Sequence, residues 1–161
     1  MKLLVSLSAA LAALAGAASA EDTGKTFGAW KVVCDAQKTC QAFLGLKDKT
    51  TGRLALSASA HKVAADPNPT LVLTLPLGLS IRNGVALAPG AGGKPLPAVV
   101  DVCFPDGCRV VVDLSAATLD ALSAAENFEV RFIGYGVTDR VESIVVPSNG
   151  LKAAVADLSR K

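Results

Sequence analysis

The chain has few aromatic residues, a single histidine and no large excess of either charge. Aromatic side chains make up 4% of the 161 residues, so a core must be built mainly from Val, Leu and Ala. Sixteen Lys and Arg residues oppose 14 Asp and Glu residues, which excludes the basic surface of a nucleic-acid-binding protein. The length suits one domain and excludes a large multidomain enzyme.

The chain also lacks the motifs of common catalytic and metal sites. There is no G-x-S-x-G, H-E-x-x-H or C-x-x-C pattern. The segment Pro89–Pro97 is rich in glycine, but Ala88 replaces the first glycine of a phosphate loop and Pro95 replaces its Ser or Thr. His61 lies in a strand pattern with no motif around it, so we expect a surface residue. These absences predict no catalytic residues, no cofactor and no metal.

Two pairs of carboxylates are the remaining candidates for acid–base chemistry. Asp101 with Asp106 and Glu126 with Glu129 could form a glycosidase site, but charges near turns and helix ends are usually solvated. An enzyme is therefore the third hypothesis. Four charged residues point outward on two predicted strands and are expected to form cross-strand ion pairs: Arg109, Asp113, Glu129 and Arg131. Four aromatic residues could form a ligand-binding face, but burial in the core is expected instead: Phe27, Trp30, Phe128 and Phe132.

The N-terminus has the pattern of a signal peptide. Lys2 precedes the apolar run Leu3–Gly16, and a small-x-small triplet ends at Ala20. We expect cleavage between Ala20 and Glu21, which assigns residues 1–20 to the leader. A membrane anchor is the alternative, but no basic stop-transfer flank follows the run. The prediction is export to the periplasm, with outer-membrane association or secretion as alternatives and no stable membrane insertion after leader removal.

The four cysteines fit an exported protein, because an even number in an oxidising compartment usually means disulfides. The short spacings favour local closure of Cys34 with Cys40 and of Cys103 with Cys108. The count alone also allows crossed pairings. Neither pair has the spacing of a thioredoxin-like redox site or of a zinc site. Structural disulfides are the prediction.

Residues 21–161 are predicted to form a single, mainly β domain. Alternating apolar residues, as in Leu71–Leu75, predict about nine strands, and two short helices are expected near residues 116–126 and 151–158. The Asn83-Gly84 dipeptide predicts a two-residue hairpin turn between Leu79–Arg82 and Val85–Leu87. The absence of internal repeats and the many short strands favour an antiparallel β-sandwich or a barrel-like domain.

The residues from Phe27 to about Leu158 resemble the invasion-associated locus B family of exported bacterial proteins. The segment from Phe27 to Cys34 is similar to the family's opening F-G-x-W-x-V-x-C, and Cys103 to Cys108 resembles its C-x-x-x-G-C hairpin. Leu151 departs from the pattern, since an aromatic residue is usual there. The resemblance implies a β-rich periplasmic or surface-associated protein without catalytic residues, some of whose relatives are associated with invasion of host cells.

The leading hypothesis is a non-enzymatic envelope protein that binds an unidentified envelope or host protein. Sheet edges or end loops such as Pro89–Pro97 are the expected binding elements, and the disulfides would stiffen the hairpins. The alternative is a periplasmic carrier that holds a small ligand in a cavity between sheets. The sequence alone does not identify the edge strands or the oligomeric state.

Overall fold

The computed structural model describes residues 24–63, 65–90, 93–136 and 140–158. The predicted leader and the cleavage site between Ala20 and Glu21 lie outside the described residues. In the described part, ten strands form: β1 (Lys25–Phe27), β2 (Trp30–Cys34), β3 (Cys40–Lys47), β4 (Leu54–His61), β5 (Thr70–Leu75), β6 (Val85–Pro89), β7 (Leu96–Phe104), β8 (Gly107–Asp113), β9 (Asn127–Ile133) and β10 (Val141–Pro147). The helices are α1 (Ala116–Ser123) and α2 (Leu151–Leu158), and Ile81–Asn83 forms one 3-10 turn.

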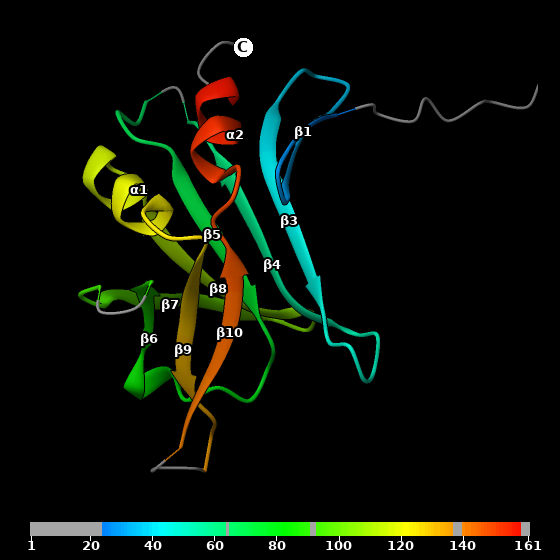
Figure 1. The fold of residues 1–161 in the computed structure, drawn as a ribbon. Coiled ribbons are helices and arrows are strands. Elements are labelled where there is room, and N and C mark those ends of the chain that lie inside the picture. The colour runs from blue at the N-terminus through cyan, green and yellow to red at the C-terminus, as the bar shows by residue number, and fades with distance from the viewer. Residues whose placement is uncertain (1–23, 64, 91–92, 137–139, 159–161) are drawn as a thin grey trace, which may run out of the picture.

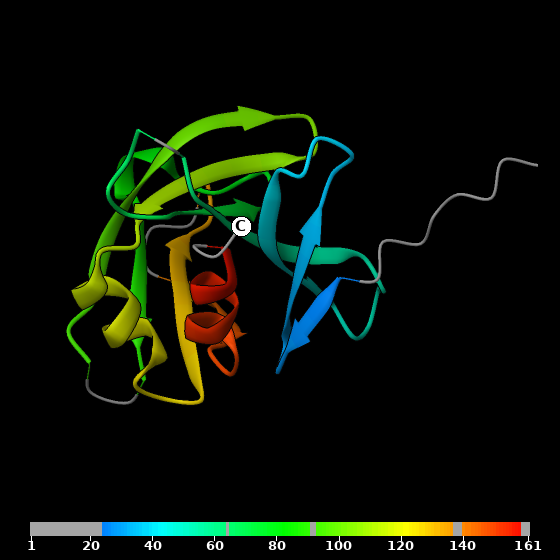
Figure 2. The ribbon, with the colours of Figure 1, turned by 90° about the horizontal axis from the view of Figure 1, so that it is seen from above.

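The ten strands form one antiparallel sheet in the order β1-β2-β3-β4-β5-β8-β7-β6-β9-β10. The sheet curls into a half-barrel, which Figures 1 and 2 show from two directions. β7 makes the corner, because its residues 96–98 pair with β6 and its residues from Val99 onward pair with β8. A register shift between Val100 and Val102 bends the strand there. The mainly β, antiparallel, barrel-like fold class is therefore confirmed.

The predicted alternation places Leu, Val and Ala side chains on the inner face of the sheet. Leu71, Leu73 and Leu75 on β5 are at most 1% exposed. Because successive residues of a strand point to opposite faces, the residues between them lie on the outer face. Trp30 and Phe128 are the two fully buried aromatic residues of the described core, which confirms that aliphatic side chains fill most of it.

Both helices lie at the same end of the curled sheet (Figure 1). α2 packs against β1 to β4, and α1 packs against β6, β9 and α2. The Ser115 side chain accepts a hydrogen bond from the Thr118 amide at 3.2 Å, which is the predicted N-cap of α1. This helix ends at Ser123, three residues before the predicted end, and β9 begins at Asn127.

The predicted hairpin at Asn83-Gly84 is wrong. Leu79 makes only an isolated bridge to Gly134, and Ile81–Asn83 is a 3-10 turn closed by the Gly84 amide donating to the Ile81 carbonyl at 3.1 Å. Gly84 has φ 67° and ψ −167°. Glycine adopts this conformation readily, but it is not the conformation that the expected two-residue hairpin turn requires. β6 pairs instead with β7 and β9, so long-range pairing overrides the local turn signal.

The two ends of the sheet meet at a junction beneath α2. The Trp30 indole donates to the Pro147 carbonyl at 2.9 Å, and the Ala29 amide donates to the Asn149 carbonyl at 3.1 Å. Gly150 has φ +91°, and a Cβ at this position would clash with the Phe27 carbonyl oxygen. β1, which the sequence did not predict, belongs to this junction.

We expect Trp30→Phe to weaken this junction. The substitution keeps an aromatic ring in the core but leaves the Pro147 carbonyl without its indole donor, which costs about 1–3 kcal/mol of unfolding free energy. Denaturant unfolding followed by circular dichroism measures this loss. Tyr135→Phe, which removes a polar group from a ring that is 84% exposed, is the control and changes stability by less than about 0.5 kcal/mol. Equal effects of the two substitutions would contradict the assigned role of the indole.

Candidate binding face

The four cysteines form two disulfides, Cys34–Cys40 and Cys103–Cys108. Each bond joins two residues that are direct register partners, in the β2–β3 pair and in the β7–β8 pair. The pairing is the local one favoured by the spacing, and no cysteine of the described chain is free. Each disulfide therefore fixes the connecting turn of one hairpin.

The tip of the β7–β8 hairpin presents an exposed aromatic ring and an ion pair. The Arg109 guanidinium lies 5.3 Å from the centroid of the Phe104 ring. The same guanidinium donates to the Asp106 carboxylate at 2.7 Å, and this hydrogen bond lowers the pKa of Asp106. Gly107 has φ +141°, and a Cβ there would approach the Leu75 carbonyl, so the tip needs glycine at this position.

The hydrogen bond between Arg109 and Asp106 is expected to make a contribution to stability that depends on pH. Because the hydrogen bond from Arg109 holds the folded pKa of Asp106 below its ordinary value, the contact stabilises the protein above that ordinary value, and the contribution is lost as the pH falls through the folded pKa. Arg109→Gln should raise the pKa of Asp106 toward its ordinary value, measured by NMR titration of the carboxyl carbon. Arg131→Gln removes a guanidinium remote from the hairpin tip and should leave the Asp106 titration unchanged. A pKa that does not respond to Arg109→Gln would contradict the assigned cause.

The predicted cross-strand ion pairs are wrong. Arg109 bonds Asp106 in its own turn, and Arg131 Nε bonds the Glu129 carboxylate on its own strand at 2.9 Å. Asp113 accepts instead from the Asn68 side chain at 3.2 Å. For Arg131 and Glu129 the reason is geometric, since residues two apart on one strand share a face and their side chains can meet without crossing to a neighbouring strand. For Arg109, the turn before β8 brings Asp106 within reach.

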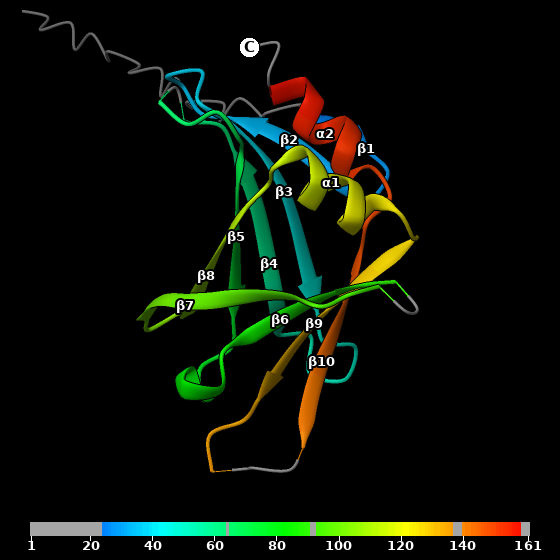
Figure 3. The same ribbon diagram turned by 90° about the vertical axis from the view of Figure 1, so that its left-hand side faces the viewer.

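The outer faces of β6, β9 and β10 form a continuous surface, here called the binding face. Two rows of register partners cross it, Ala88–Glu129–Val145 and Ala86–Arg131–Ser143. Val130, between the two rows, and Phe128, just beyond them, are fully buried on the opposite side. Figure 3 shows the β9–β10 hairpin extending away from the two helices. The binding face is therefore an outer, solvent-facing surface.

Two hollows lie on this face and share Arg131. The first, of about 420 Å³, lies at the end near α1 and is lined by Ala88, Gly90, Ala125, Glu129, Arg131 and Val145, among others. The second, of about 390 Å³, lies toward the β9–β10 loop and is largely apolar: its lining includes Pro95, Pro97, Arg131, Ile133 and Val141. Gly90, Pro95 and Pro97 belong to the predicted binding loop Pro89–Pro97, so this loop borders both hollows.

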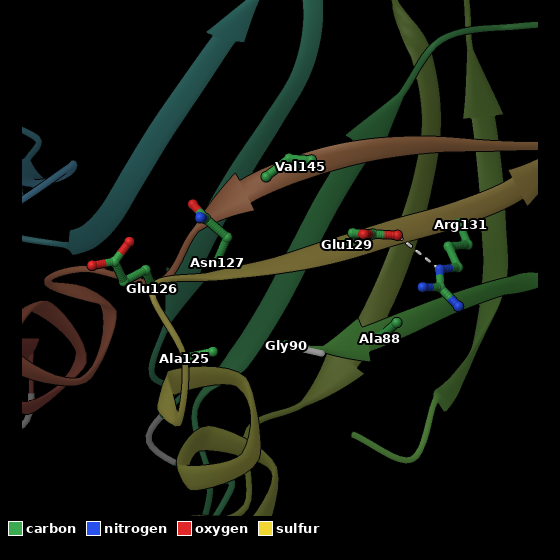
Figure 4. Close-up of a pocket in the computed structure, with 8 residues that line it drawn as sticks. All are labelled: Ala88, Gly90, Ala125, Glu126, Asn127, Glu129, Arg131 and Val145. Carbon is green, nitrogen blue, oxygen red and sulfur yellow. Dashed lines mark hydrogen bonds and ion pairs between the residues drawn. The ribbon is translucent and has the colours of Figure 1, made fainter. Parts of the chain in front are cut away.

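The close-up in Figure 4 shows how the charged side chains lie in the first hollow. Glu129 points along β9 toward Arg131, whereas Glu126 lies at the opposite end of the hollow and points away from that pair. The predicted carboxylate pair Glu126/Glu129 thus shares a hollow, but Glu129 is bonded to a cation. Asp101 and Asp106 lie apart from this hollow, on β7 and in the turn after it.

His61 lies at the end of β4 and lines another hollow beside the Cys34–Cys40 disulfide. The four aromatic residues expected in the core are there: Trp30 and Phe128 are buried, and Phe27 and Phe132 pack against them partly buried. In the described part of the chain no group of three His, Cys, Asp or Glu side chains is placed to hold a metal ion. Of the helices described, none has the length and apolar character to cross a membrane.

Sequence reasoning did not find the binding face itself. Its hollows exist because small residues, Ala86, Ala88, Gly90 and Ala125, leave space beside longer side chains. A run of small residues at alternating positions of a strand is a weak signal, since it fits a tightly packed core equally well. Predicting this face would also have required the strand order, because β6 and β9 are neighbours in the sheet but far apart in the sequence.

Comparison with known proteins identifies a protein family and solved structures of similar fold. The family model described as "Invasion associated locus B (IalB) protein" matches residues 30–159. No curated protein matches the chain significantly. The crystal structure of invasion associated protein B from Bartonella henselae is similar, with a TM-score of 0.76 and 22% sequence identity, covering 85% of this chain and 96% of that chain. At this identity, the likeness shows a shared fold.

Proposed function

The chain belongs to the invasion associated locus B family, and we propose that it is an exported, non-enzymatic envelope protein that binds another protein. The leader pattern and the two disulfides support export to an oxidising compartment. The protein of similar fold is an invasion associated protein of Bartonella henselae. A role in host-cell invasion or in maintenance of the envelope is consistent with both.

The observation that carries the proposal is the placement of Arg131 at the centre of the binding face. Its side chain is 44% exposed and lines both hollows, between Ala, Pro and Val side chains. Arginine is enriched at protein interfaces because its planar guanidinium packs on apolar surface while it bonds carboxylates in pairs. An acidic side chain of a partner protein, seated between the two hollows, fits this chemistry.

Two further observations favour binding over catalysis. Glu129, the carboxylate nearest the centre of the face, already accepts a hydrogen bond from Arg131. All four cysteine sulfur atoms are held in disulfides, so no thiolate is available as a nucleophile. The hollows open to solvent and the inner face of the sheet is filled by side chains, so nothing in the described residues favours the alternative of a carrier.

Site-specific photocrosslinking in living bacteria tests the proposal. A photoreactive amino acid at Ala86, on the binding face, should yield a defined protein adduct. Arg131→Glu should reduce that adduct about tenfold, because it replaces the guanidinium with a repelling carboxylate. The same photoreactive group at Phe43, exposed on β3, is the matched control. Adducts of equal yield from both positions, or an adduct that survives Arg131→Glu, would contradict the proposed site.

Intact mass tests the proposed export. We expect the protein recovered from the periplasmic fraction to begin at Glu21 and to gain mass on alkylation only after reduction, because all four thiols are oxidised. Non-reducing peptide mapping should recover the two local disulfides. A protein that retains residues 1–20, or that reacts with an alkylating agent before reduction, would count against this compartment.

A further inference from the structure

The edges of the sheet differ in how they are protected against pairing with another chain. β1 is three residues long, and the free stretch of β7 beyond Val99 carries the register shift and Asp101. Short strands, bulges and charges are the usual protections of an edge. β10 is seven residues long and pairs with β9 without a shift, and its one charged residue, Glu142, is paired with Arg140 of its own chain. In the described part of the chain, β10 is therefore the long unprotected edge.

The backbone orientation along β10 follows from two hydrogen bonds. The Ile133 carbonyl accepts from the Ser80 amide at 2.7 Å, so the backbone of Ile133 points away from β10. Because orientation alternates in an antiparallel pair, the N–H and C=O groups of Val141, Ser143 and Val145 point away from β9. The Pro147 carbonyl, which accepts from the Trp30 indole outside the sheet, fits the same alternation. Among the described strands, only β9 pairs with β10.

We propose that β10 binds the β10 strand of a second copy of this chain, antiparallel about a two-fold axis at Ser143. In this register Val141 faces Val145 of the other copy, and the two Ser143 residues face each other. All outward N–H and C=O groups of Val141, Ser143 and Val145 then find partners, which gives six hydrogen bonds between strands. Placing the axis at Ile144 would set Val141 opposite Pro147. Pro147 has no N–H, and its carbonyl already accepts from the Trp30 indole, so only the four hydrogen bonds between Ser143 and Val145 would form.

The side chains of β10 are symmetric about the same axis. The outer face reads Val141, Ser143, Val145, and the two valines are 59% and 54% exposed. A two-fold interface uses the same surface on both copies, so it requires a self-complementary surface of this kind. Two cross-strand Val–Val pairs flank the central serines, and pairs of β-branched residues stabilise antiparallel strands. This symmetry identifies the occupant of the edge as a second copy rather than an unrelated strand.

Pairing would also join the binding faces of the two copies. Arg131 is the register partner of Ser143 within one chain, so the row Ala86–Arg131–Ser143 would continue through the axis into the second copy. The hollow lined by Val145 in one copy would then adjoin the hollow lined by Val141 in the other. The dimer does not depend on the proposed function, since it needs no further partner.

Sedimentation equilibrium of the purified protein tests the dimer. We expect a monomer–dimer equilibrium and a dissociation constant raised at least tenfold by Ser143→Lys, because two like charges would face each other at the axis. Val99→Lys places the same charge on an exposed position away from β10 and should leave the constant unchanged. A wild-type protein that remains a monomer at about 100 μM, where weak complexes assemble, would overturn the proposal.

A disulfide-crosslinking variant tests the same register without the charged substitution, which could alter folding. In Ser143→Cys the two introduced thiols would face each other as a register pair, within reach of a disulfide. Mild oxidation should yield a covalent dimer, and peptide mapping should find the bond between the two copies of position 143. Val99→Cys should give no such dimer at the same concentration. Equal crosslinking at both positions, or none at position 143, would overturn the proposed register.

Discussion

The hydrogen bond from the Trp30 indole to the Pro147 carbonyl links the beginning of the sheet to its end. A ten-stranded sheet has two edges. If these edges lay apart, the large apolar inner face of the sheet would be exposed to solvent. Joining β2 to the end of β10 curls the sheet around that face, and α2 covers the junction (Figure 2). Lys25 adds an ion pair to Asp157, which is 2% exposed on α2. The remaining strands can bury aliphatic residues because this junction holds the curl.

The same junction explains why β10 is only partly protected. Its end is covered, since Pro147 and, just beyond the strand, Asn149 bond to the β1–β2 segment. Its earlier residues run away from the junction toward the β9–β10 loop (Figure 3), where β9 lies on one side and no described strand pairs with the other side. The interaction that closes one end of the half-barrel thereby leaves the other end open, with both the strand edge and the binding face exposed.

Local patterns in the sequence were sufficient for most elements of the fold. Alternation in Leu71–Leu75 and the short spacing of Cys103 and Cys108 are consequences of local geometry, and both matched the structure. The Asn83-Gly84 hairpin failed because the local turn preference had to compete with the pairing of β6 to β7 and β9. β1 was missed because a three-residue strand has too few positions to show alternation. It pairs with β2, and Lys25 also contacts Asp157, 132 positions away, a contact that no local pattern shows.

The binding face could not be predicted in the same way, because it is defined by strand order and by empty space. Arg131 was singled out as a surface charge, and its expected partners lay on another strand. In the structure it bonds Glu129 and stands between two hollows formed by small residues. An exposed arginine that is already paired still has guanidinium donors beyond the Nε group used by Glu129. This arrangement fixes the orientation of the side chain and leaves donors for a partner carboxylate, which is what a preformed recognition site requires.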